Sequence, residues 1–487
     1  MKKLRDILYR SRIKEVRGST DLDVTRIAFD SRQVEPGNVF VAVRGTTVDG
    51  HDYINKAISA GASAIVCEDF PQELDSEKTY VKVSSSAISL GYMASNFFDN
   101  PSEKLEVIGV TGTNGKTSVV TLLYQLFSDL GHKCGQLSTV ENRINDKVFP
   151  STHTTSDALS INYLMREMVS KGCKYCFMEV SSHALDQHRV AGICFSRAVF
   201  TNITHDHLDY HKTFNNYLAA KKKLFDMLCA DSLAIVNKDD QHWASLIKNS
   251  PTRVRTFGLK SSSDYKGKIV ENSMSGLHLE INGFELWTPL VGRFNASNLL
   301  AVFAVANTYD QDDVKVLTVL SKLRGARGRF QQVTSDDGVH GIVDYAHTPD
   351  ALQNVLRTID QVRSGNEKII TVIGCGGDRD REKRPRMAQI AARFSDRVVL
   401  TSDNPRSEDA VAIIDEMKSG LNPIEKSKTL ELVNRAEAIK TAVMMSAPGD
   451  VILVAGKGHE TYQDVRGKKI PFDDLKILQE IMNQTTS

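Results

Sequence analysis

The sequence predicts an α/β protein built from three domains, and three observations support this prediction. The chain has 487 residues, more than one ordinary hydrophobic core holds, and domains of roughly 100–200 residues would divide it into about three. Short apolar runs alternate with helical stretches over most of its length, which favours mostly parallel sheets with helices on both faces. Polar clusters follow several of these runs, at the position where the strands of open α/β sheets meet their ligands.

The first predicted domain spans residues 1–103 and is a small α/β unit. Its strand-like apolar runs include residues 39–43 and 64–67. The segment Pro-Ser-Glu-Lys at 101–104 has the composition of a linker and marks the boundary with the next domain.

The central domain is predicted over residues 104–329 and begins with a compact strand at 105–110. A glycine loop follows, and then a helix whose apolar residues recur about every 3.6 positions until Gly131 ends it. Further strands are expected at 176–180, 198–201 and 233–237. The third domain, residues 330–487, repeats the alternation and is expected to be Rossmann-like. Its expected strands are 342–343, 369–373, 398–401 and 451–455.

Composition and charge exclude several classes of protein. The 61 basic and 60 acidic residues leave a net charge of +1, whereas a dedicated nucleic-acid-binding protein presents a strongly basic face. The sequence contains no apolar run of about 18 residues and no secretory leader, so we expect a cytoplasmic protein without membrane insertion. A monomer is a separate expectation, which no sequence pattern supports. The seven cysteines follow no pattern, which is typical of reduced thiols. The one close pair, Cys173 and Cys176, could be half of a zinc site or a redox pair, but packing is the preferred interpretation.

A phosphate-binding loop is the most informative motif. The sequence Thr-Gly-Thr-Asn-Gly-Lys-Thr at 111–117 lies between a predicted strand and a predicted helix. In such a loop, glycines turn backbone N–H groups toward phosphate oxygens, Lys116 reaches the β- and γ-phosphates, and the Thr117 hydroxyl binds Mg²⁺. Val110 stands where the strict pattern requires glycine, so a glycine turn with a surface lysine is the alternative. The expected nucleotide contacts are Gly112, Thr113, Asn114, Gly115, Lys116, Thr117 and Ser118.

Acidic and histidine side chains follow the next two predicted strands. Glu179 lies at a strand end, and three histidines occur within seven residues of the segment 201–211. A lone glutamate there is often only a solvated strand end, and three histidines could indicate zinc. The histidine spacing matches no usual structural zinc motif, however. A mixed set of histidines and carboxylates beside a phosphate loop fits Mg²⁺ or Mn²⁺ better.

The phosphate loop, the Glu-Val-Ser-Ser-His segment at 179–183 and the Asp-His-Leu-Asp-Tyr-His segment at 206–211 together resemble the Mur ligase family. Its members add amino acids to UDP-N-acetylmuramoyl peptides during peptidoglycan synthesis. The resemblance extends from about residue 30 to about residue 460. The family's loop departs from the strict pattern in the same way, which removes the objection from Val110. The resemblance implies an ATP-dependent, amide-forming ligase that uses Mg²⁺, with a central domain of the P-loop type.

The resemblance also assigns contacts to the UDP-N-acetylmuramoyl dipeptide. The segment 29–42 resembles the signature of the amino-terminal domain, which holds the uridine nucleotide. Read without the family, it is an ordinary turn followed by a glycine loop. The implied uridine contacts are Phe29, Ser31, Thr46, Thr47 and Val48. The implied contacts to the muramoyl dipeptide are Thr154, Thr155, Ser181, Gln187 and Arg189.

Catalytic and metal-binding roles are carried over in the same way. The resemblance implies that Lys221 is carbamylated by CO₂ and assists a second Mg²⁺ together with His207. A lysine triplet such as 221–223 is otherwise usually a solvated helix face. The implied metal ligands are Thr117, Glu179, His207 and Lys221, and the implied catalytic residues are Lys116, Glu179, His207, Lys221 and Arg329. Further implied nucleotide contacts are Asn298, Arg329, Asp344 and His347. Arg327 stands where the family commonly has proline, which makes the local turn there an open question.

The amino-acid pocket is the most discriminating part of the sequence. The Asp-Asn-Pro-Arg segment at 403–406 follows a predicted strand, and alone it would be read as a proline turn. Relatives with this tetrapeptide add meso-diaminopimelate, and lysine-adding relatives lack the arginine. Arg406 can bind the second carboxylate of diaminopimelate but repels the ammonium group of lysine. The implied pocket residues are Arg379, Asp403, Asn404, Pro405, Arg406, Gly456 and Glu460.

Several alternative functions follow from the same motifs. A lysine-adding member of the family or a folylpolyglutamate-synthase-like ligase shares the phosphate loop, although the latter is not expected to carry the segments at 30–32 and 403–406. A P-loop motor would need an apolar strand ending in Asp-Glu, which is absent from the sequence. A non-catalytic nucleotide sensor should have lost Lys116, Glu179 or His207, and all three are present.

Overall fold

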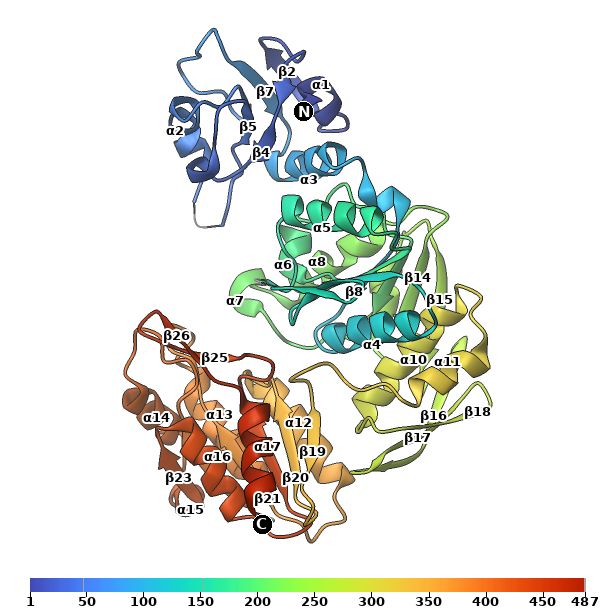
Figure 1. The fold of residues 1–487 in the computed structure, drawn as a ribbon, viewed down its shortest axis with the longest axis vertical. Coiled ribbons are helices and arrows are strands. Elements are labelled where there is room, and N and C mark those ends of the chain that lie inside the picture. The colour runs from blue at the N-terminus through green and yellow to red at the C-terminus, as the bar shows by residue number, and fades with distance from the viewer. Residues whose placement is uncertain (47, 152, 486–487) are drawn as a thin grey trace. The chain divides into compact units, whose positions relative to one another are not determined.

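The computed structural model describes residues 1–46, 48–151 and 153–485. The chain forms two compact units, one of residues 1–268 and 297–320 and one of residues 269–296 and 321–487. Each unit combines sheets and helices (Figure 1), so the predicted α/β class is confirmed. The domain boundaries after residues 103 and 329 stay predictions. Among the described residues, no helix combines the length and apolar character needed to cross a membrane.

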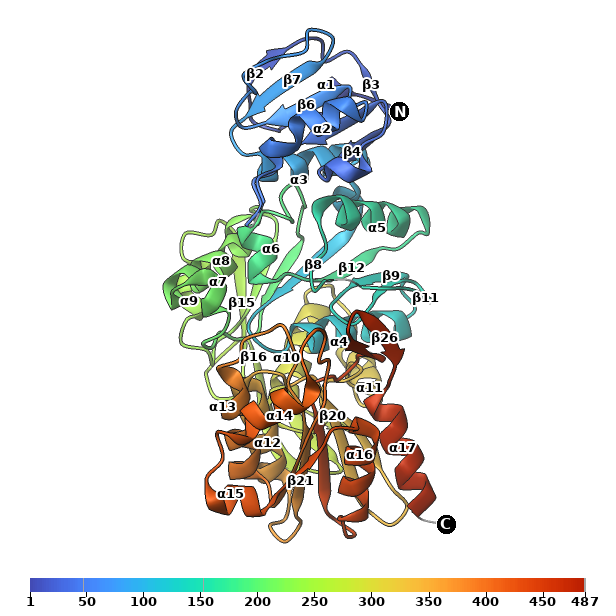
Figure 2. The same cartoon turned by 90° about the vertical axis from the view of Figure 1, so that its left-hand side faces the viewer.

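The first unit begins with a five-stranded sheet in the order β2-β7-β6-β5-β4 (Figure 2). Strands β4 to β7 run parallel, and β2 pairs antiparallel with β7 at one edge. Alternate strand residues enter two cores: Val39 packs with one helix, α3, and Phe40 with another, α2. The apolar runs at 39–43 and 64–67 do form strands, β5 and β6. The bounds are α1 (Leu4–Ile7), β2 (Ile13–Arg17), β4 (Arg26–Ala28), β5 (Asn38–Val41), α2 (Ile54–Ser59), β6 (Ala64–Cys67), β7 (Thr79–Val83) and α3 (Ser86–Phe97), with a small pair β1 (Lys2–Lys3) and β3 (Asp23–Val24).

The larger sheet of the first unit contains a run of seven parallel strands in the order β9-β12-β8-β13-β14-β15-β16, where β16 is Tyr265–Ser273. Strand β8 lies between β12 and β13, so that Val110 is opposite Glu179 and Thr111 is opposite Phe200. The segments that follow these three strands therefore begin side by side. The strand bounds are β8 (Glu106–Thr111), β9 (Cys134–Leu137), β10 (Asn142–Ile144), β11 (Lys147–Phe149), β12 (Tyr175–Glu179), β13 (Arg197–Phe200), β14 (Leu233–Asn237) and β15 (Arg253–Gly258).

Helices cover both faces of this sheet (Figure 1). Phe177 of β12 packs against Phe127 of α4, with ring centroids 5.1 Å apart. Its neighbours Cys176 and Met178 point the other way and enter a core with Met165 of α5 and other residues of α5 and α8. The helix bounds are α4 (Lys116–Asp129), α5 (Ala158–Ser170), α6 (Ser182–Asp186), α7 (Leu208–His211), α8 (Phe214–Asp226), α9 (Trp243–Ile247) and α11 (Asp313–Leu320). The strand β16 (Tyr265–Ser273) and the helix α10 (Arg293–Asn307) each contribute residues to both units.

The second unit contains a hairpin of β17 (Gly276–Ile281) and β18 (Phe284–Thr288) and a six-stranded sheet in the order β19-β20-β24-β21-β22-β23. The last five strands run parallel, and β19 is an antiparallel edge. Residues of α12, α13 and α14 form the core on one face, and residues of α16 and α17 form the core on the other, as a doubly wound sheet requires.

The remaining bounds of the second unit are as follows. The strands are β19 (Gln331–Thr334), β20 (His340–Asp344), β21 (Ile369–Ile373), β22 (Arg397–Thr401), β23 (Thr429–Leu432), β24 (Val451–Ala455), β25 (Tyr462–Val465) and β26 (Lys468–Pro471). The helices are α12 (Pro349–Val362), α13 (Lys383–Phe394), α14 (Ala410–Lys418), α15 (Pro423–Ser427), α16 (Arg435–Met444) and α17 (Asp474–Thr485).

Candidate active site

The glycine loop connects the end of β8 to the start of α4. Gly112 has a φ of +154°, and a Cβ atom there would lie 1.9 Å from Oγ1 of Thr201. The loop is braced by the residues after β13: Thr201 donates to the carbonyl of Asn114 at 2.6 Å, and the side-chain oxygen of Asn202 accepts from the Asn114 amide at 3.0 Å. The loop thus lies against β13, at the N-terminus of a helix, where backbone N–H groups attract anions.

Two lysines donate hydrogen bonds to the same loop carbonyl. Nζ of Lys116 is 3.0 Å from the Gly112 oxygen and 2.9 Å from the Thr113 oxygen. Nζ of Lys221, on α8, is 2.6 Å from the Gly112 oxygen. Lys221 is 1% exposed and lies over the ring of Tyr217 at 4.6 Å. Burial, and then the charge of Lys116, lowers the pKa of Lys221 well below its usual value, which favours a neutral amine.

Glu179 lies at the end of β12 and is 1% exposed. One carboxylate oxygen accepts from the Thr139 amide at 2.8 Å, and the other accepts from the Thr139 hydroxyl at 3.1 Å. Each oxygen has further lone pairs, so the carboxylate can also bind a cation. Thr117 is buried and is the second residue of α4, directly after the glycine loop.

His207 precedes α7 in a left-handed conformation, with a φ of +54°. Its ring lies 4.8 Å from that of His183, and Nε2 is 3.6 Å from a carboxylate oxygen of Asp206. The His207 side chain is 44% exposed, yet partial desolvation lowers its pKa to about 4; Asp206 acts against this shift, and His183 and the two lysines near the loop act with it. A neutral imidazole is the form that binds metals.

The expected metal ligands fit a Mg²⁺ site that substrate phosphates and water complete better than a site in which the protein supplies every ligand. In the described ranges, no group of three or more histidine, cysteine or acidic residues is arranged to hold a metal ion. Mg²⁺ is usually bound through one or two carboxylates together with substrate phosphates and water. Glu179 beside a phosphate loop supplies such a donor. Lys221 could supply a second carboxylate only after carbamylation, for which its neutral amine is the reactive form.

Four of the expected dipeptide contacts are connected by hydrogen bonds. The Thr155 hydroxyl donates to the Glu179 carbonyl at 2.9 Å and accepts from the Ser181 amide at 3.1 Å. Arg189 donates to the Thr155 carbonyl at 2.9 Å and to Oε1 of Gln187 through Nε at 2.9 Å and Nη2 at 2.5 Å. Through the Thr155 hydroxyl, these residues are hydrogen-bonded to Glu179 at the end of β12. Thr154, the fifth expected contact, is half-buried next to Thr155.

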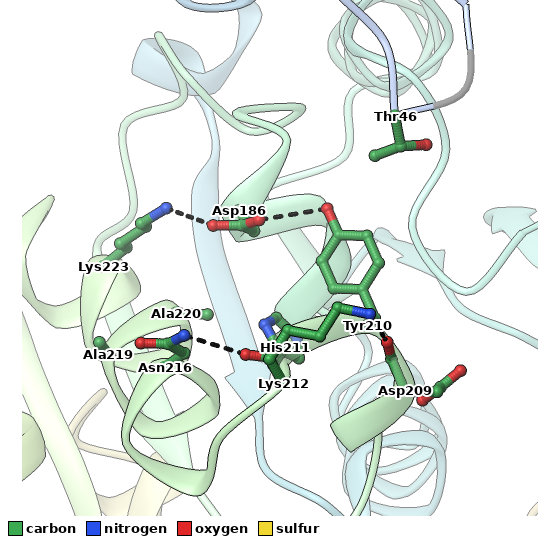
Figure 3. Close-up of a pocket in the computed structure, with 10 residues that line it drawn as sticks. All are labelled: Thr46, Asp186, Asp209, Tyr210, His211, Lys212, Asn216, Ala219, Ala220 and Lys223. Carbon is green, nitrogen blue, oxygen red and sulfur yellow. Dashed lines mark hydrogen bonds and ion pairs between the residues drawn. The ribbon is translucent and has the colours of Figure 1, made fainter.

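A cavity of about 630 Å³ lies beside this group (Figure 3). Its lining includes Thr46, Tyr210 and Lys223. Asp186 accepts from the Tyr210 hydroxyl at 3.1 Å and from Lys223 at 2.8 Å, and Gln187 donates to the same hydroxyl at 3.2 Å. The cavity therefore adjoins the chain of hydrogen bonds that ends at Arg189.

The other expected uridine contacts lie in segments that connect elements of the amino-terminal part of the chain. Phe29 follows β4 and is 38% exposed, and Val48 is also exposed. Ser31 is buried at the start of a short 3₁₀ turn, Ser31–Gln33, which Asp30 caps by accepting from the Arg32 amide at 3.0 Å. Thr47 lies outside the described residues.

The remaining nucleotide candidates belong to both units. In the first unit, Asn298 on α10 faces the loop, because a Cβ atom on Gly115 would lie 2.6 Å from its side-chain oxygen. In the second unit, the Arg329 guanidinium lies 4.7 Å from the centre of the Tyr345 ring. Asp344 accepts from the Phe330 amide at 2.6 Å, and burial raises its pKa. His347 is exposed, and its Nδ1 is 2.8 Å from the Tyr345 carbonyl.

The expected amino-acid contacts form two groups in the second unit. Asn404 donates to Oε2 of Glu460 at 2.7 Å, and a Cβ atom on Gly456 would lie 2.7 Å from a carboxylate oxygen of Asp403. Pro405 lies against the loop after β21, because its carbonyl would be 1.9 Å from a Cβ atom on Gly377. Arg406 donates to the Gly377 carbonyl at 2.5 Å, and the same loop carries Arg379.

Family models match three successive parts of the chain. The description "Mur ligase family, catalytic domain" covers residues 23–97, "Mur ligase middle domain" covers 110–306, and "Mur ligase, glutamate ligase domain" covers 328–458. A relative from Cytophaga hutchinsonii is 53% identical over 99% of both chains. The chain belongs to the Mur ligase family.

Other Mur ligases resemble this one over its full length. A Bacteroides fragilis relative is 50% identical over 99% of this chain and 100% of its own. These two relatives are named UDP-N-acetylmuramoyl-L-alanyl-D-glutamate--2,6-diaminopimelate ligase, as is a solved structure with 31% identity, a TM-score of 0.72 and coverage of 100% of this chain and 99% of that one. A MurF ligase from Thermotoga maritima, solved with ADP, is 20% identical with a TM-score of 0.63 and supports the fold alone. The resemblance inferred from the sequence is confirmed.

Sequence reasoning missed several residues of this Mur ligase that hold the expected site residues. Thr139 binds the Glu179 carboxylate, and Asn202 binds the phosphate loop. Lys457 is fully buried and donates to Asn404 at 2.9 Å and to Glu460 at 3.1 Å. For Lys457 a signal existed, because it lies inside the same Gly-Lys-Gly-His-Glu segment as Gly456 and Glu460. At the position of the family's common proline, Arg327 pairs with Asp473.

Proposed function

We propose that this Mur ligase joins meso-diaminopimelate to the D-Glu γ-carboxylate of UDP-N-acetylmuramoyl-L-Ala-D-Glu, in a reaction driven by ATP. The names of the relatives that are 53% and 50% identical support this substrate pair. The observation that carries the proposal is the convergence of Lys116 and Lys221 on the Gly112 carbonyl. A generic phosphate loop needs only the first lysine. A buried second lysine that favours the neutral amine can instead be carbamylated and assist a second Mg²⁺, which the proposed ligase reaction requires.

The chemistry proceeds in two steps. The D-Glu γ-carboxylate attacks the γ-phosphate of ATP, so that a C–O–P bond forms, the bond between the β- and γ-phosphates breaks, and ADP leaves. The amine of diaminopimelate then attacks the acyl carbon, the amide bond forms through a tetrahedral intermediate, and phosphate leaves with the C–O electron pair. Carboxylate and triphosphate repel each other, and Lys116 and Arg329 offset this repulsion.

Thr117 and Glu179 would hold one Mg²⁺, His207 and carbamylated Lys221 would assist a second, and both ions would supply further charge neutralisation. In this proposal, the neutral amine of Lys221 attacks the carbon of CO₂ and releases one proton to solvent, so that a neutral amine becomes an anionic carbamate. The low pKa that burial gives Lys221 supports this step, because a protonated amine has no lone pair for the attack.

The remaining proposed roles concern the two other substrates. Arg189 and Gln187 hold the acceptor dipeptide, and their mutual hydrogen bonds fix the guanidinium plane in which a carboxylate or phosphate can bind through two contacts. Arg406 binds the second carboxylate of diaminopimelate. Phe29, Ser31, Thr46, Thr47 and Val48 hold the uridine nucleotide. A cytoplasmic location and a monomeric state are also part of the proposal.

The test supplies the purified protein with ATP, Mg²⁺ and UDP-N-acetylmuramoyl-L-Ala-D-Glu, and adds meso-diaminopimelate or L-lysine in separate reactions. We expect phosphate release that depends on diaminopimelate, with the tripeptide product visible by mass spectrometry. An equal or higher rate with lysine would contradict the assigned amino acid. If neither amino acid led to phosphate release, the ligase assignment would be contradicted.

A further inference from the structure

A buried arginine connects the two loops that carry the expected amino-acid contacts. Arg384, on α13, is 0% exposed. Its Nη1 and Nη2 donate to the two carboxylate oxygens of Glu408 at 2.9 Å and 2.8 Å. Nη1 also donates to Glu416 at 2.8 Å, and Nη2 to the Gly376 carbonyl at 3.3 Å. A bidentate pair of this kind fixes both distance and orientation.

Glu408 carries this connection across to the loop after β21. Its Oε1 accepts from the Asp378 amide at 2.6 Å, and its Oε2 accepts from Arg381 at 2.9 Å. The loop that contains Arg379 is therefore attached, through one carboxylate, to the loop that contains Arg406. The hydrogen bonds from Arg384 lower the pKa of Glu408 to about 2, so this carboxylate is charged at neutral pH.

The two loops touch closely enough for one to set the position of the other. The Gly377 amide donates to the Asn404 carbonyl at 2.9 Å, and the Ser407 hydroxyl donates to an Asp378 carboxylate oxygen at 2.5 Å. A methyl group on Gly377 would collide with the Pro405 carbonyl. Because Arg406 donates to the Gly377 carbonyl, a shift of this loop changes where the arginine points.

The backbone of Arg406 is held in an uncommon conformation at the same junction. Its φ is +51°, in the left-handed region, where side chains other than glycine are strained. Its amide donates to the Asp464 carbonyl at 2.9 Å, and its carbonyl accepts from the Arg466 amide at 2.7 Å. The direction of the guanidinium is thus set by two constraints, which are the strained backbone of Arg406 and the hydrogen bond to the Gly377 carbonyl.

We propose that Glu408, clamped by Arg384, is a positioning residue that sets the preference of the pocket for an amino acid with a second carboxylate. This inference rests on the proposed function. Glu408 acts through Arg406 and the Gly377 loop. Recognition of a carboxylate by arginine depends on angle and on distance to within a fraction of an ångström, so a loosened loop weakens it while leaving the nucleotide contacts of the other unit intact.

Glu416 offers a matched control for this role. It accepts from the same guanidinium, at nearly the same distance as Glu408, but it lies on α14. Among the described residues its contact with the loop after β21 is an ion pair with Arg381 at 3.7 Å, and it accepts no backbone amide of that loop, unlike Glu408. A residue that serves only to stabilise the fold would affect all three substrates alike. A positioning residue changes the KM for one amino acid and leaves kcat at saturation near the wild-type value.

The experiment compares full-length wild type, Glu408→Gln and Glu416→Gln, with KM and kcat measured for ATP, the UDP-linked dipeptide and diaminopimelate, and with lysine as a competitor. For Glu408→Gln we expect the KM for diaminopimelate to rise about tenfold or more, which is the loss of about one oriented charge-assisted contact. The ratio of diaminopimelate to lysine use should fall with it. The KM for ATP in Glu408→Gln should stay within about twofold of the wild-type value. All kinetic constants of Glu416→Gln should also stay within about twofold, the usual range for a substitution away from the substrate contacts.

Each remaining outcome decides a different question. Equal effects of Glu408→Gln and Glu416→Gln, or a parallel rise of all three KM values in Glu408→Gln, overturn the positioning role alone. A wild type that releases no phosphate with diaminopimelate overturns the proposed function and this inference with it. If Glu408→Gln does not fold, Ser407→Ala removes a different bond between the same loops, and an unchanged KM for diaminopimelate in that variant also overturns the role.

Discussion

Lys221 shows how strongly a single residue depends on its surroundings. Lys221 and Lys116 both donate to one carbonyl, and two full positive charges there would repel each other. The neighbouring Lys222 and Lys223 instead pair with Asp226 and Asp186 and remain partly exposed. Burial thus separates one lysine of the triplet from the other two, and only that one favours the neutral form.

Carbamylation of Lys221 can be tested by isotope labelling. In ¹³C-bicarbonate, wild type should show a protein carbamate resonance, because burial lowers the pKa of Lys221 well below its usual value and so favours the amine form that reacts with CO₂. Lys221→Arg should lose that resonance and roughly 10–100-fold of the activity, as is common when a metal site is disturbed. The measurement is ¹³C NMR of both proteins, followed by the phosphate-release assay.

Lys222→Ala is the control, since Lys222 forms an exposed pair with Asp226 and has no expected role. A carbamate signal that survives in Lys221→Arg, or disappears in Lys222→Ala, would contradict the assignment to Lys221.

At this scale the sequence indicates candidate motif residues but does not indicate the residues that hold them in place. Gly112 and Lys116 lie in a pattern that is local in the chain, so their roles can be inferred from neighbours. Thr139 is hydrogen-bonded to Glu179, 40 positions away, and Asn202 to Asn114, 88 positions away. No local sequence pattern predicts such contacts. The sheet brings these distant residues together, and the sequence alone does not reveal the order of its strands.

The helix α4 shows the same contrast between its two ends. It begins at a loop pressed against Thr201 and ends before Gly131, which has a φ of +89°. A methyl group on Gly131 would meet no atom of the described residues within 4 Å. Both ends use glycine, but for different reasons. At the first end there is no space for a side chain, and at the second only the backbone angle matters.

Alanine substitutions at these two glycines should therefore separate function from stability. Gly112→Ala places a methyl group 1.9 Å from the Thr201 hydroxyl, so the loop must move and we expect nucleotide binding to be lost. Gly131→Ala should cost about 1–2 kcal/mol of unfolding free energy through its left-handed backbone and leave nucleotide affinity unchanged. Calorimetric titration with an ATP analogue and urea unfolding measure the two effects.

Retained nucleotide affinity in Gly112→Ala would show that the loop is not the binding element. Lost affinity in Gly131→Ala would show that the two ends are coupled through the helix.

Strands were easier to predict than their order. β8, β12 and β24 are buried on both faces and appear as continuous apolar runs. The placement of β8 between β12 and β13 depends on crossover connections that no local pattern reveals. The exposed pair β25 and β26 lacks an apolar run and was not predicted, although it holds the backbone of Arg406.

At the scale of the whole molecule, the phosphate loop and the amino-acid pocket belong to different compact units with separate cores. The loop is supported by β8 and β13, whereas Arg406 is supported by β25 and the loop after β21. We therefore expect a substitution in one set of supports to leave the other set in place.

Arg406→Ala tests this separation. The substitution removes the cation expected to bind the second carboxylate, so the KM for diaminopimelate should rise by about 10-fold to 100-fold, the range for a charge-assisted contact. The affinity for an ATP analogue should remain unchanged. Steady-state kinetics and calorimetry provide the two values, and a collapse of nucleotide affinity would contradict the pocket assignment.

The fold class and the family could be predicted from sequence at this scale because the motifs extend along almost the whole chain. The division into two compact units could not, because β16 and α10 each pass between them without a break in secondary structure. Linker composition, which served to suggest the boundary near residue 103, gives no signal where a boundary falls inside a helix.

The left-handed backbone at residue 406 also limits how this protein could evolve a different amino-acid preference. Any replacement of Arg406 must tolerate a φ near +51°, which glycine, asparagine and aspartate do readily and β-branched residues do not. Selection for a cationic substrate would thus draw on a short list of residues, fixed by backbone geometry before side-chain chemistry is considered. The same list is where a protein engineer should begin.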